Sequence, residues 1–477
     1  MLKINSMKFF STKKVIGMFI GRKNEVEEIK STLKNPGKHV LIYGNRRVGK
    51  TTLAVESAKK IDALFISFEC LKTSIKNNID ELTKLLNDNN LLSFNISFNT
   101  IIDLFKYLNS LNKHIILLID EYPYLYVKND KDMIDSYFQN VLDNYSSNLN
   151  IILSGSHIGM MKTIIKESNP LFGRFDTVIH LKEFDYYEAS LFYDNLSNYD
   201  KVAFYSVFGG SPFILGQLDY SESLEYNIKK TFLNLNSAIY LFVSENYTND
   251  LATKDMASSI FSIISNGNVK YSRLEELLGY EHNGLLNKQL NTLIEMEFLG
   301  KNEPINKIGD NKKVTYYIKN NALRFYFLYV YAKKNTITLL GSNEYYNKYI
   351  SNNIITFISK RFEEISRCFL SLIIKKGYIK DIVNLGTYYY DDSKTKTNGE
   401  FDIAVETHSG FDIIEVKYLK GKVSKEIINK EISQIKEIKG IKINNYGFIS
   451  INGFEDDIPN LEYKYEGDDL YSKNFKI

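Results

Sequence analysis

The chain of 477 residues has only two cysteines, no tryptophan and no long apolar run. Cys70 and Cys368 lie far apart, without the spacing of a metal-binding motif. This excludes a disulfide scaffold and favours a reducing, cytoplasmic location. The apolar run Val15–Ile20 is much shorter than a signal-peptide core or a membrane span, so we expect no export signal and no membrane partner.

An excess of charge of one sign is also missing. The chain has 60 Lys and Arg against 57 Asp and Glu, a net charge of +3. Overall charge therefore gives no argument for nucleic acid or acidic membranes, and any basic binding surface must be local. The length exceeds what one hydrophobic core usually serves, so we expect several domains and divide the chain into residues 1–235, 236–342 and 343–477.

The most specific motif is Gly44–Thr51, GNRRVGKT, which fits the pattern G-x-x-x-x-G-K-[ST] and directly follows the apolar run His39–Tyr43. A strand, a glycine loop and a helix in this order curl backbone N–H groups around phosphate oxygens. Lys50 would reach the β- and γ-phosphates, and the Thr51 hydroxyl would ligate Mg²⁺. No guanine-reading N-K-x-D follows, so we predict an ATP site. Its predicted lining residues are Gly44, Asn45, Arg46, Arg47, Val48, Gly49, Lys50, Thr51 and Thr52.

Further short apolar runs, separated by helical stretches, predict an α/β fold with a parallel sheet covered by helices. These runs are Leu64–Phe68, His114–Ile119, Ile151–Ser154 and Thr177–Leu181. The second of them ends in Asp120 and Glu121, and ligands of parallel sheets gather at the carboxyl ends of strands. We expect Asp120 in the Mg²⁺ shell and Glu121 as the group that polarises water for ATP hydrolysis.

Two later segments leave alternatives open. Ser154 or Ser156 could sense the γ-phosphate or orient water. The alternatives are that Ser156 caps a helix or that the segment is a simple glycine turn. Arg174, in PLFGRF, could contact a γ-phosphate in its own or a neighbouring subunit, and the second case would require an oligomer. The alternative for Arg174 is a surface arginine paired with a carboxylate.

Six segments carry a family resemblance: FIGRKNE, GNRRVGKT, LLIDEYPYL, ILSGSHIGMM, PLFGRF and GGSPFIL, in that order. The first half of the chain resembles the archaeal-type ATPases of the AAA-like signal-transduction (STAND) class. The resemblance implies that Gly21 and Arg22 lie near the nucleotide base. It also implies that Pro212 marks a helical lid over the nucleotide.

Residues 255–318 read as helices followed by a hairpin, which predicts a winged helix-turn-helix. Ser272 with Glu275 forms a capping-box pattern, and the helix 284–297 is apolar on one face. Its outward residues would be Asn287, Lys288, Gln289, Asn291 and Thr292, and two strand-like runs in 306–318 would form a wing with Lys307, Lys312 and Lys313. This face could enter a DNA major groove, with DNA expected ahead of RNA, or the module could serve for intramolecular packing or for contacts with another protein.

The last third reads as a helix, three strands, a helix and a strand. A helix over 358–376 carries Glu363, and strands are predicted over 382–390, 400–406 and 411–418. Asp402 lies on the second strand, and Glu415 and Lys417 share one face of the third. Two such acids can bind a divalent metal, here a second one in the chain. A nearby lysine can activate water or steady a phosphate, and Glu363 would complete the metal shell.

This set resembles the restriction-endonuclease-like, PD-(D/E)xK superfamily, with Phe401 where the family name has proline. The alternative is a solvated strand edge. On the following helix, Lys425, Lys430, Lys436 and Lys439 could contact a phosphate backbone or simply face water. The whole pattern predicts an ATPase whose nucleotide state controls nucleic-acid binding and metal-dependent cleavage. The alternative is a nucleotide-dependent switch or DNA-binding regulator whose C-terminal domain does not cleave.

Overall fold

A computed structural model describes residues 9–11, 19–92, 96–126, 131–246, 254–279, 284–392, 397–438 and 440–472. Lys439 and part of the run Val15–Ile20 lie outside these ranges. The chain forms two compact units, Met1–Glu183 and Phe184–Ile477. Both predicted domain boundaries, after residues 235 and 342, fall within the second unit, and the three-domain division stays a prediction. No helix within the described ranges is long and apolar enough to cross a membrane.

The first unit is built on a six-stranded sheet in the order β1-β3-β4-β5-β2-β6, and every neighbouring pair is parallel. The predicted α/β fold with a parallel sheet is therefore confirmed. The strands are β1 (Phe9–Ser11), β2 (Val40–Tyr43), β3 (Leu64–Glu69), β4 (Ile115–Asp120), β5 (Leu149–Gly155) and β6 (Thr177–His180). The two central strands β4 and β5 are buried along their whole length, which explains their continuous apolar sequence.

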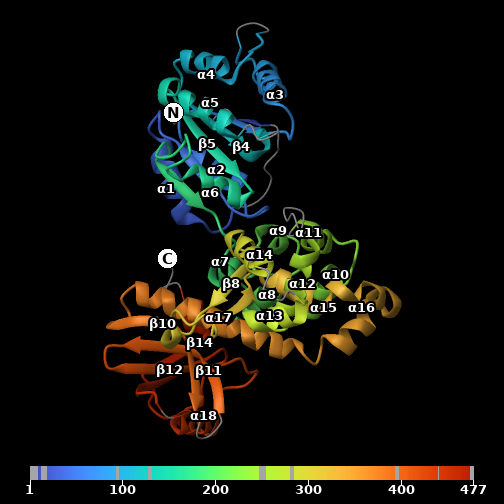
Figure 1. The fold of residues 1–477 in the computed structure, drawn as a ribbon, viewed down its shortest axis with the longest axis vertical. Helices are drawn as coiled ribbons and strands as arrows, with labels where there is room; N and C mark the ends of the chain where they lie inside the picture. The colour runs from blue at the N-terminus through green and yellow to red at the C-terminus, as the bar shows by residue number, and fades with distance from the viewer. Residues whose placement is uncertain are drawn as a thin grey trace, which may run out of the picture. The chain divides into compact units, whose positions relative to one another are not determined.

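Helices cover both faces of this sheet (Figure 1). They are α1 (Lys23–Leu33), α2 (Lys50–Ala58), α3 (Ile75–Asp88), α4 (Ile101–Ser110), the short η1 (Tyr122–Leu125), α5 (Lys131–Asn144) and α6 (Ile158–Ile164). Neighbouring strand residues alternate between two cores: Leu41 and Leu117 pack with α3 to α6, whereas Ile42 and Leu118 pack with α1 and α2. This period of two is the geometry of a strand buried on both faces.

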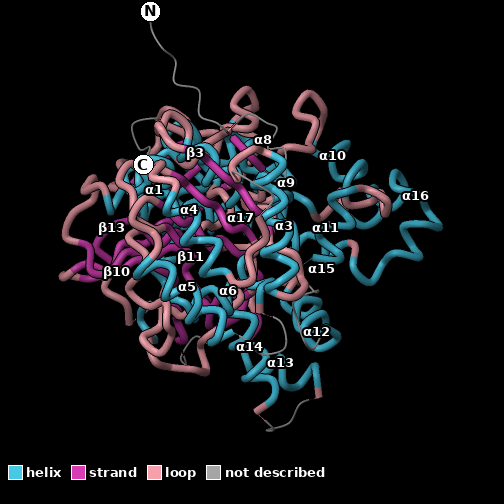
Figure 2. The backbone as a smooth tube through the Cα atoms, turned by 90° about the horizontal axis from the view of Figure 1, so that it is seen from above, coloured by secondary structure: helices cyan, strands magenta, loops and turns pink. Residues whose placement is uncertain are grey.

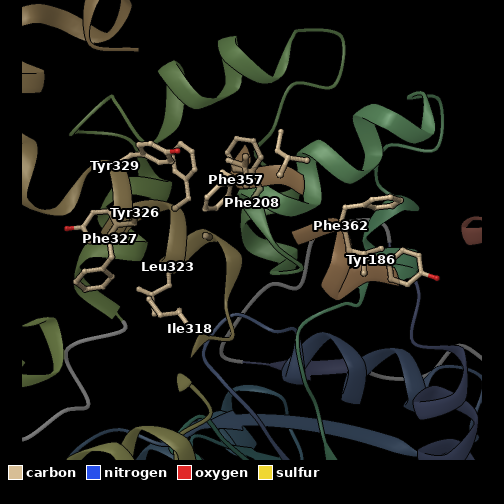
Figure 3. Close-up of a cluster of buried hydrophobic side chains, with 14 of the residues drawn as sticks. Tyr186, Phe208, Ile318, Leu323, Tyr326, Phe327, Tyr329, Phe357 and Phe362 are labelled. Carbon is tan, nitrogen blue, oxygen red and sulfur yellow. The ribbon is translucent and has the colours of Figure 1, made fainter. Parts of the chain in front are cut away.

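The second unit begins with helices that share one large apolar core. They are α7 (Tyr186–Ser190), α8 (Asn198–Phe208), α9 (Pro212–Leu215), α10 (Leu224–Thr231), α11 (Ala238–Asn246), α12 (Lys254–Ile264), α13 (Tyr271–Leu278), α14 (Leu285–Glu295), α15 (Asn321–Tyr329), η3 (Tyr331–Lys333), α16 (Lys334–Tyr349) and α17 (Ile354–Lys375). Aromatic rings connect them: Phe325 of α15 contacts Phe232 and Phe357, with ring centroids 4.9 and 5.6 Å apart. Figure 3 shows part of this cluster, including Phe357 and Phe362 of α17.

Helices α12, α13 and α14 lie side by side (Figures 1 and 2). A small antiparallel sheet in the order β7-β9-β8 accompanies them, with β7 between α12 and α13 and the other two strands after α14. Its strands are β7 (Val269–Lys270), β8 (Leu299–Asn302) and β9 (Thr315–Ile318). The sequence predicts that the first strand of the hairpin begins at Asn306. In the structure this strand is β8, which already ends at Asn302. Pro304 has no N–H for a strand ladder, and the chain continues as the short helix η2 (Ile305–Lys307).

Two details of the predicted helices in this region are wrong. Helix α13 begins at Tyr271, so Ser272 lies inside it, and no side chain caps its N-terminus. Gln289 was expected to face outward from α14, yet it is buried beside Leu286 and Leu290. The helical face that packs inward is thus wider than the row of leucines alone indicates.

The chain ends in a mixed five-stranded sheet in the order β10-β11-β12-β13-β14. The strands are β10 (Ile382–Asp392), β11 (Thr397–Thr407), β12 (Gly410–Lys417), β13 (Ile443–Ser450) and β14 (Tyr463–Glu466), with helices α18 (Lys425–Glu437) and α19 (Gly467–Leu470). The first three strands are antiparallel and the last three are parallel. Ile414 joins the core of α17, whereas its neighbour Ile413 packs with Ile435 of α18. One helix therefore covers each face.

Candidate functional site

The loop Gly44–Thr51 connects β2 to α2 and has the backbone conformation that its glycines predict. A Cβ atom on Gly44 would lie 1.9 Å from the carbonyl oxygen of Leu181, so only glycine fits there. Gly49 (φ 96°) and Arg47 (φ 63°) both adopt the left-handed conformation, and Gly49 caps the N-terminus of α2. The chain thus curls tightly in front of a helix N-terminus, which is the geometry of an anion cradle.

Lys50 lies buried within this loop. Its Nζ donates hydrogen bonds of 3.0 Å to the carbonyl oxygens of Gly44 and Asn45. Burial lowers the pKa of Lys50, and the charges of Glu121 and Asp120 oppose this shift. An ammonium held only by neutral carbonyls gains charge-assisted hydrogen bonds when phosphate oxygens reach it. The position of Lys50 therefore suits the predicted contact with the β- and γ-phosphates.

Asp120, the last residue of β4, joins three segments of the predicted site. Its Oδ2 accepts a hydrogen bond from the Thr51 hydroxyl of α2, and its Oδ1 accepts one from the Ser154 hydroxyl of β5. The backbone N–H of Glu121 also donates to Oδ1, at 3.0 Å. A hydroxyl and a carboxylate held together are the oxygen ligands that Mg²⁺ prefers. Thr51 and Asp120 therefore fit the predicted magnesium ion.

Glu121 follows in the left-handed conformation (φ 52°), at the start of η1. Its Oε2 accepts hydrogen bonds from the Ser156 hydroxyl at 2.7 Å and from the Ser156 N–H at 3.2 Å. The helix-cap alternative for Ser156 is wrong, because His157 caps α6. The pairing of β4 with β5 explains the contact, since it brings the residues after both strands together. Sequence reasoning placed both segments at this edge but did not pair these two residues.

A buried network behind Glu121 was not predicted. The hydroxyls of Tyr122 and Tyr126 both donate to Oδ1 of Asp135, at 2.8 and 2.7 Å, and Asn169 donates to Oδ2 at 2.7 Å. Burial raises the pKa of the Tyr122 hydroxyl, so it stays protonated and able to donate. The network ties η1, directly after Glu121, to α5. The DEYPYLY segment contains these tyrosines, but their shared acceptor lies further along the chain.

The remaining predicted nucleotide contacts differ in their surroundings. Arg174 donates from Nε and Nη2 to the two carboxylate oxygens of Asp143, both at 2.9 Å, which is the ion-pair alternative. Arg22 is buried in the left-handed conformation after Gly21, with an ion pair of 3.3 Å to Glu25. Pro212 begins α9, in the other unit. Roles for these four residues at the nucleotide stay predictions.

The second unit brings together the four residues predicted for a metal site. Burial, reinforced by the charge of Asp402, raises the pKa of Glu363 to about 8. Burial also raises the pKa of Asp402, with the charge of Glu400 adding to the shift, and the pKa of Glu415, with Glu431 and Asp402 adding to it. Glu415 and Lys417 have side chains only 19% exposed, which does not fit a solvated strand edge.

Two partners of this acidic cluster (Glu363, Asp402, Glu415 and Lys417) were missed. Glu431 of α18 accepts a hydrogen bond of 2.7 Å from Lys417 Nζ, shorter than the 3.4 Å to Glu415. Arg367 of α17 donates to the Asp402 carbonyl at 2.7 Å. Alone, burial would lower the pKa of Lys417, but the two glutamates outweigh it and raise that pKa. On α18 the sequence predicts only lysines as candidate contacts, and it does not single out Glu431, which lies among them.

The cluster is not a preformed metal cage. Among the residues that the structure describes, no group of three or more His, Cys, Asp or Glu side chains is arranged to hold a metal ion. Mg²⁺ keeps several water ligands in most protein sites and needs only one or two carboxylates. Asp402 and Glu415 supply that number, so the donor set suits such an ion without a complete cage.

Comparison with known proteins identifies the first site. Residues 19–218 match the family model described as an ATPase domain predominantly from Archaea. Residues 326–433 match a model described as archaeal and bacterial proteins of unknown function. A protein of Methanocaldococcus jannaschii, called uncharacterized protein MJECL04, is 27% identical over 335 residues, which cover 67% of this chain and 70% of the relative.

Solved structures resemble the chain only loosely. The ORC2 protein of Aeropyrum pernix aligns with a TM-score of 0.44 and 12% identity over 69% of this chain and 96% of its own. The RuvB Holliday junction branch migration motor of Thermotoga maritima has a TM-score of 0.31 and 19% identity, over 60% and 91%. The match of residues 19–218 to an ATPase domain, together with the phosphate-binding loop that the structure shows there, supports ATP binding and hydrolysis by this part of the chain.

Proposed function

We propose that ATP binding and hydrolysis in the first unit control nucleic-acid binding and metal-dependent phosphodiester cleavage by residues 343–477. One observation carries the cleavage part of this proposal: Glu363, Asp402 and Glu415 lie close together, each only partly exposed, beside Lys417. Buried carboxylates repel one another and lose hydration, so such a set is costly without a cation. A divalent metal is the cation that this donor set suits.

At the nucleotide, the residues take the following roles. Lys50 binds the β- and γ-phosphates, and Thr51 with Asp120 would hold Mg²⁺, which neutralises phosphate charge when bound. Glu121 accepts the proton of the attacking water, and Ser156 holds its carboxylate in place. Ser154 orients Asp120 rather than touching the γ-phosphate itself.

In the acidic cluster, Asp402 and Glu415 would bind the metal, which polarises the phosphodiester when bound. Glu363 supports it from α17. Because Glu415 and Glu431 raise the pKa of Lys417, this lysine stays protonated at neutral pH. It therefore acts as a cation that steadies the phosphate and not as a base. These roles are the ones that the proposed PD-(D/E)xK arrangement requires.

Residues 254–318 support a winged helix as the nucleic-acid module. On α14 the residues Asn287, Lys288 and Asn291 are exposed, as a helix that enters a DNA groove requires. In the proposed wing Lys307 and Lys312 are exposed, whereas Lys313 lies over the ring of Tyr389, 3.9 Å from its centroid. DNA is the polymer that we expect, ahead of RNA.

The wing also contacts the strand that precedes the acidic cluster. Asn306 donates to the Tyr389 carbonyl at 2.8 Å and accepts from its N–H at 3.0 Å. Asn302 of β8 donates to the Glu400 carboxylate, two residues before Asp402, at 2.8 Å. These bonds give a direct physical route by which nucleic acid on the winged helix could influence the cluster.

A cleavage assay tests the proposal. The full chain is incubated with single- and double-stranded DNA and RNA, with Mg²⁺ or Mn²⁺, and with and without ATP. We expect metal-dependent products that disappear in Asp402→Asn and Lys417→Ala and persist in the matched control Lys420→Ala, an exposed lysine on the same segment. If neither the wild-type chain nor Lys417→Ala cuts any of these polymers, the proposed cleavage activity is wrong.

The second candidate is a nucleotide-dependent switch or regulator whose C-terminal domain does not cleave. The missing three-residue metal group among the described residues and the pairing of Lys417 with two glutamates favour it. A Mn²⁺ titration of the full chain, with the P-loop silenced by Lys50→Ala, separates the two candidates. Cleavage requires Mn²⁺ binding that Asp402→Asn and Glu415→Gln weaken, whereas a binding-only domain gives no such dependence.

A further inference from the structure

A cavity of about 710 Å³ lies within the second unit, between α17, β10 and the β8-β9 hairpin. Its lining includes Tyr317 and Lys319 from the hairpin and Arg361, Arg367 and Lys375 from α17. Pockets for small molecules occupy about 300–1,000 Å³ in proteins, so the cavity has the size of a ligand site. Neither the ATP site nor the proposed metal ligands form its wall.

The charge around the cavity is strongly unbalanced. Four cations line it, Lys319, Arg361, Arg367 and Lys375, against one carboxylate, Glu364. That carboxylate is shared, because Arg361 and the neighbouring Arg324 both pair with its Oε1, at 3.3 and 3.1 Å. The side chains of these two arginines are only 8% and 3% exposed. The cations of the lining therefore outnumber its carboxylates, which suits an anionic ligand.

Arg361 contributes a guanidinium group to this lining. Its Nε is a buried donor with no hydrogen-bond partner among the described residues. Arg367 donates one N–H to the Asp402 carbonyl, which is neutral. Guanidinium groups match phosphate oxygens as forks of parallel donors. Two arginines and two lysines on one cavity therefore form a phosphate-binding wall.

The rest of the lining suits the organic part of a nucleotide. Tyr205 and Tyr317 add partly exposed aromatic rings, and bases stack on such rings. Asn268 and Asn384 add amides, which can both donate to and accept from a base edge. We propose that this cavity binds a small phosphorylated ligand of nucleotide size, at a site separate from the P-loop.

Calorimetry on the full chain tests the proposal directly. The Lys50→Ala background silences the P-loop, divalent metal is left out, and the probes are ADP, AMP and inorganic pyrophosphate. We expect saturable binding of at least one probe, weakened about tenfold or more by Arg361→Gln and by Lys319→Gln, as the loss of a charge-assisted contact requires. Arg273→Gln, at a surface arginine paired with Glu276, is the matched control and leaves binding unchanged.

Both substitutions, Arg361→Gln and Lys319→Gln, should leave the fold intact. Arg324 still pairs with Glu364 when Arg361 is replaced, and Lys319 is exposed. If no probe binds, or if every probe binds equally to both variants, the proposal is wrong. If a single-stranded oligonucleotide binds with this dependence and no small probe does, the cavity is instead part of a nucleic-acid path, and the proposal is equally overturned.

Cys368 gives an independent readout, because it lines the cavity with an exposed side chain while Cys70 is buried. A maleimide therefore reaches Cys368 ahead of Cys70, and mass spectrometry follows the labelling. A bound probe should slow the labelling of Cys368 in the Lys50→Ala chain but not in its Arg361→Gln derivative. Unchanged labelling at saturating probe contradicts the proposal. Neither assay involves cleavage, so the two proposals can fail separately.

Discussion

The two acidic sites of this chain solve the problem of clustered carboxylates in opposite ways. In the first unit, Asp120 and Glu121 accept hydrogen bonds from Thr51, Ser154 and Ser156, which satisfy their charges in advance. In the second unit, burial raises the pKa values of Glu363, Asp402 and Glu415, and within the described residues only Lys417 donates to any of these three carboxylates, at 3.4 Å.

The difference shows what each site needs from a ligand. Hydrogen-bonded carboxylates are stable without metal, so ATP and Mg²⁺ meet a site whose geometry is already set. Buried carboxylates without donors are destabilised until a cation reaches them, so a metal should change the second site more than the first.

The largest effect is expected at Glu121. Glu121→Gln removes the proton acceptor but keeps the shape of the side chain, so hydrolysis should slow by about 10²–10⁴-fold, the usual contribution of a general base. ATP binding should persist, because Lys50 and the loop are unchanged. Phosphate release measures hydrolysis, and a fluorescent ATP analogue measures binding. Lys50→Ala is the contrasting variant and should abolish binding. Hydrolysis at the wild-type rate in Glu121→Gln would show that another group activates the water.

Replacing His39 tests how much stability depends on burying an ionisable side chain in the first unit, at a position away from any ligand. Burial lowers its pKa from 6.5 to about 4, and its Nδ1 accepts a hydrogen bond of 3.2 Å from the Ile151 N–H. Between these two pH values His39 binds a proton in the unfolded chain but not in the folded chain. Stability is therefore complete above pH 6.5 and falls towards pH 4, by on the order of 3 kcal/mol in total.

His39→Gln is the variant that isolates this contribution. Urea unfolding of the first unit, followed by circular dichroism from pH 7 to pH 4, should show a smaller loss of stability in the variant than in wild type. The carboxylates of the chain affect both proteins equally and cancel in the difference. Equal pH dependence in the two proteins would mean that His39 titrates normally in the folded chain.

Replacing one acid by its amide should have opposite signs at the two sites. Without metal or nucleotide, Asp120→Asn loses charge-assisted hydrogen bonds and should destabilise the first unit by about 1–3 kcal/mol. Glu363→Gln removes a crowded, buried acid and should stabilise the second unit by roughly 1–2 kcal/mol at neutral pH. Hydrogen exchange of peptides from each unit measures both, with Glu276→Gln, an exposed acid, as the control. If both substitutions changed stability in the same direction, the proposed difference between the two acidic sites would be wrong.

Local motifs predicted the elements of both sites well. The loop Gly44–Thr51, the strand before Asp120 and the three strands around Asp402 and Glu415 all follow from short patterns of apolar and polar residues. Such patterns are encoded by neighbouring residues, and each strand lies within a few residues of its predicted place. The hairpin arm was misplaced because Pro304 and a short helix separate β8 from the turn.

Long-range partners could not be predicted in the same way. Asp135 binds Tyr122 and Asn169, and Glu431 binds Lys417, but nothing in the spacing of these residues marks them as partners. The choice depends on which helix packs over which strand and in what register. Ser156 is intermediate, because the pairing of β4 with β5 would have predicted its contact with Glu121 had the strand order been known.

The smallest expected effect belongs to Ser156. Ser156→Ala removes the hydroxyl hydrogen bond of 2.7 Å to Glu121 but leaves the backbone N–H bond of 3.2 Å, so the carboxylate keeps one of its two donors. We expect ATP hydrolysis to slow by about tenfold, the value of one net hydrogen bond, with ATP affinity unchanged. Ser156→Thr retains a hydroxyl and should restore most of the rate. If Ser156→Ala hydrolyses ATP normally, hydrogen bonding does not preorganise Glu121, and the first site resembles the second more closely than its geometry indicates.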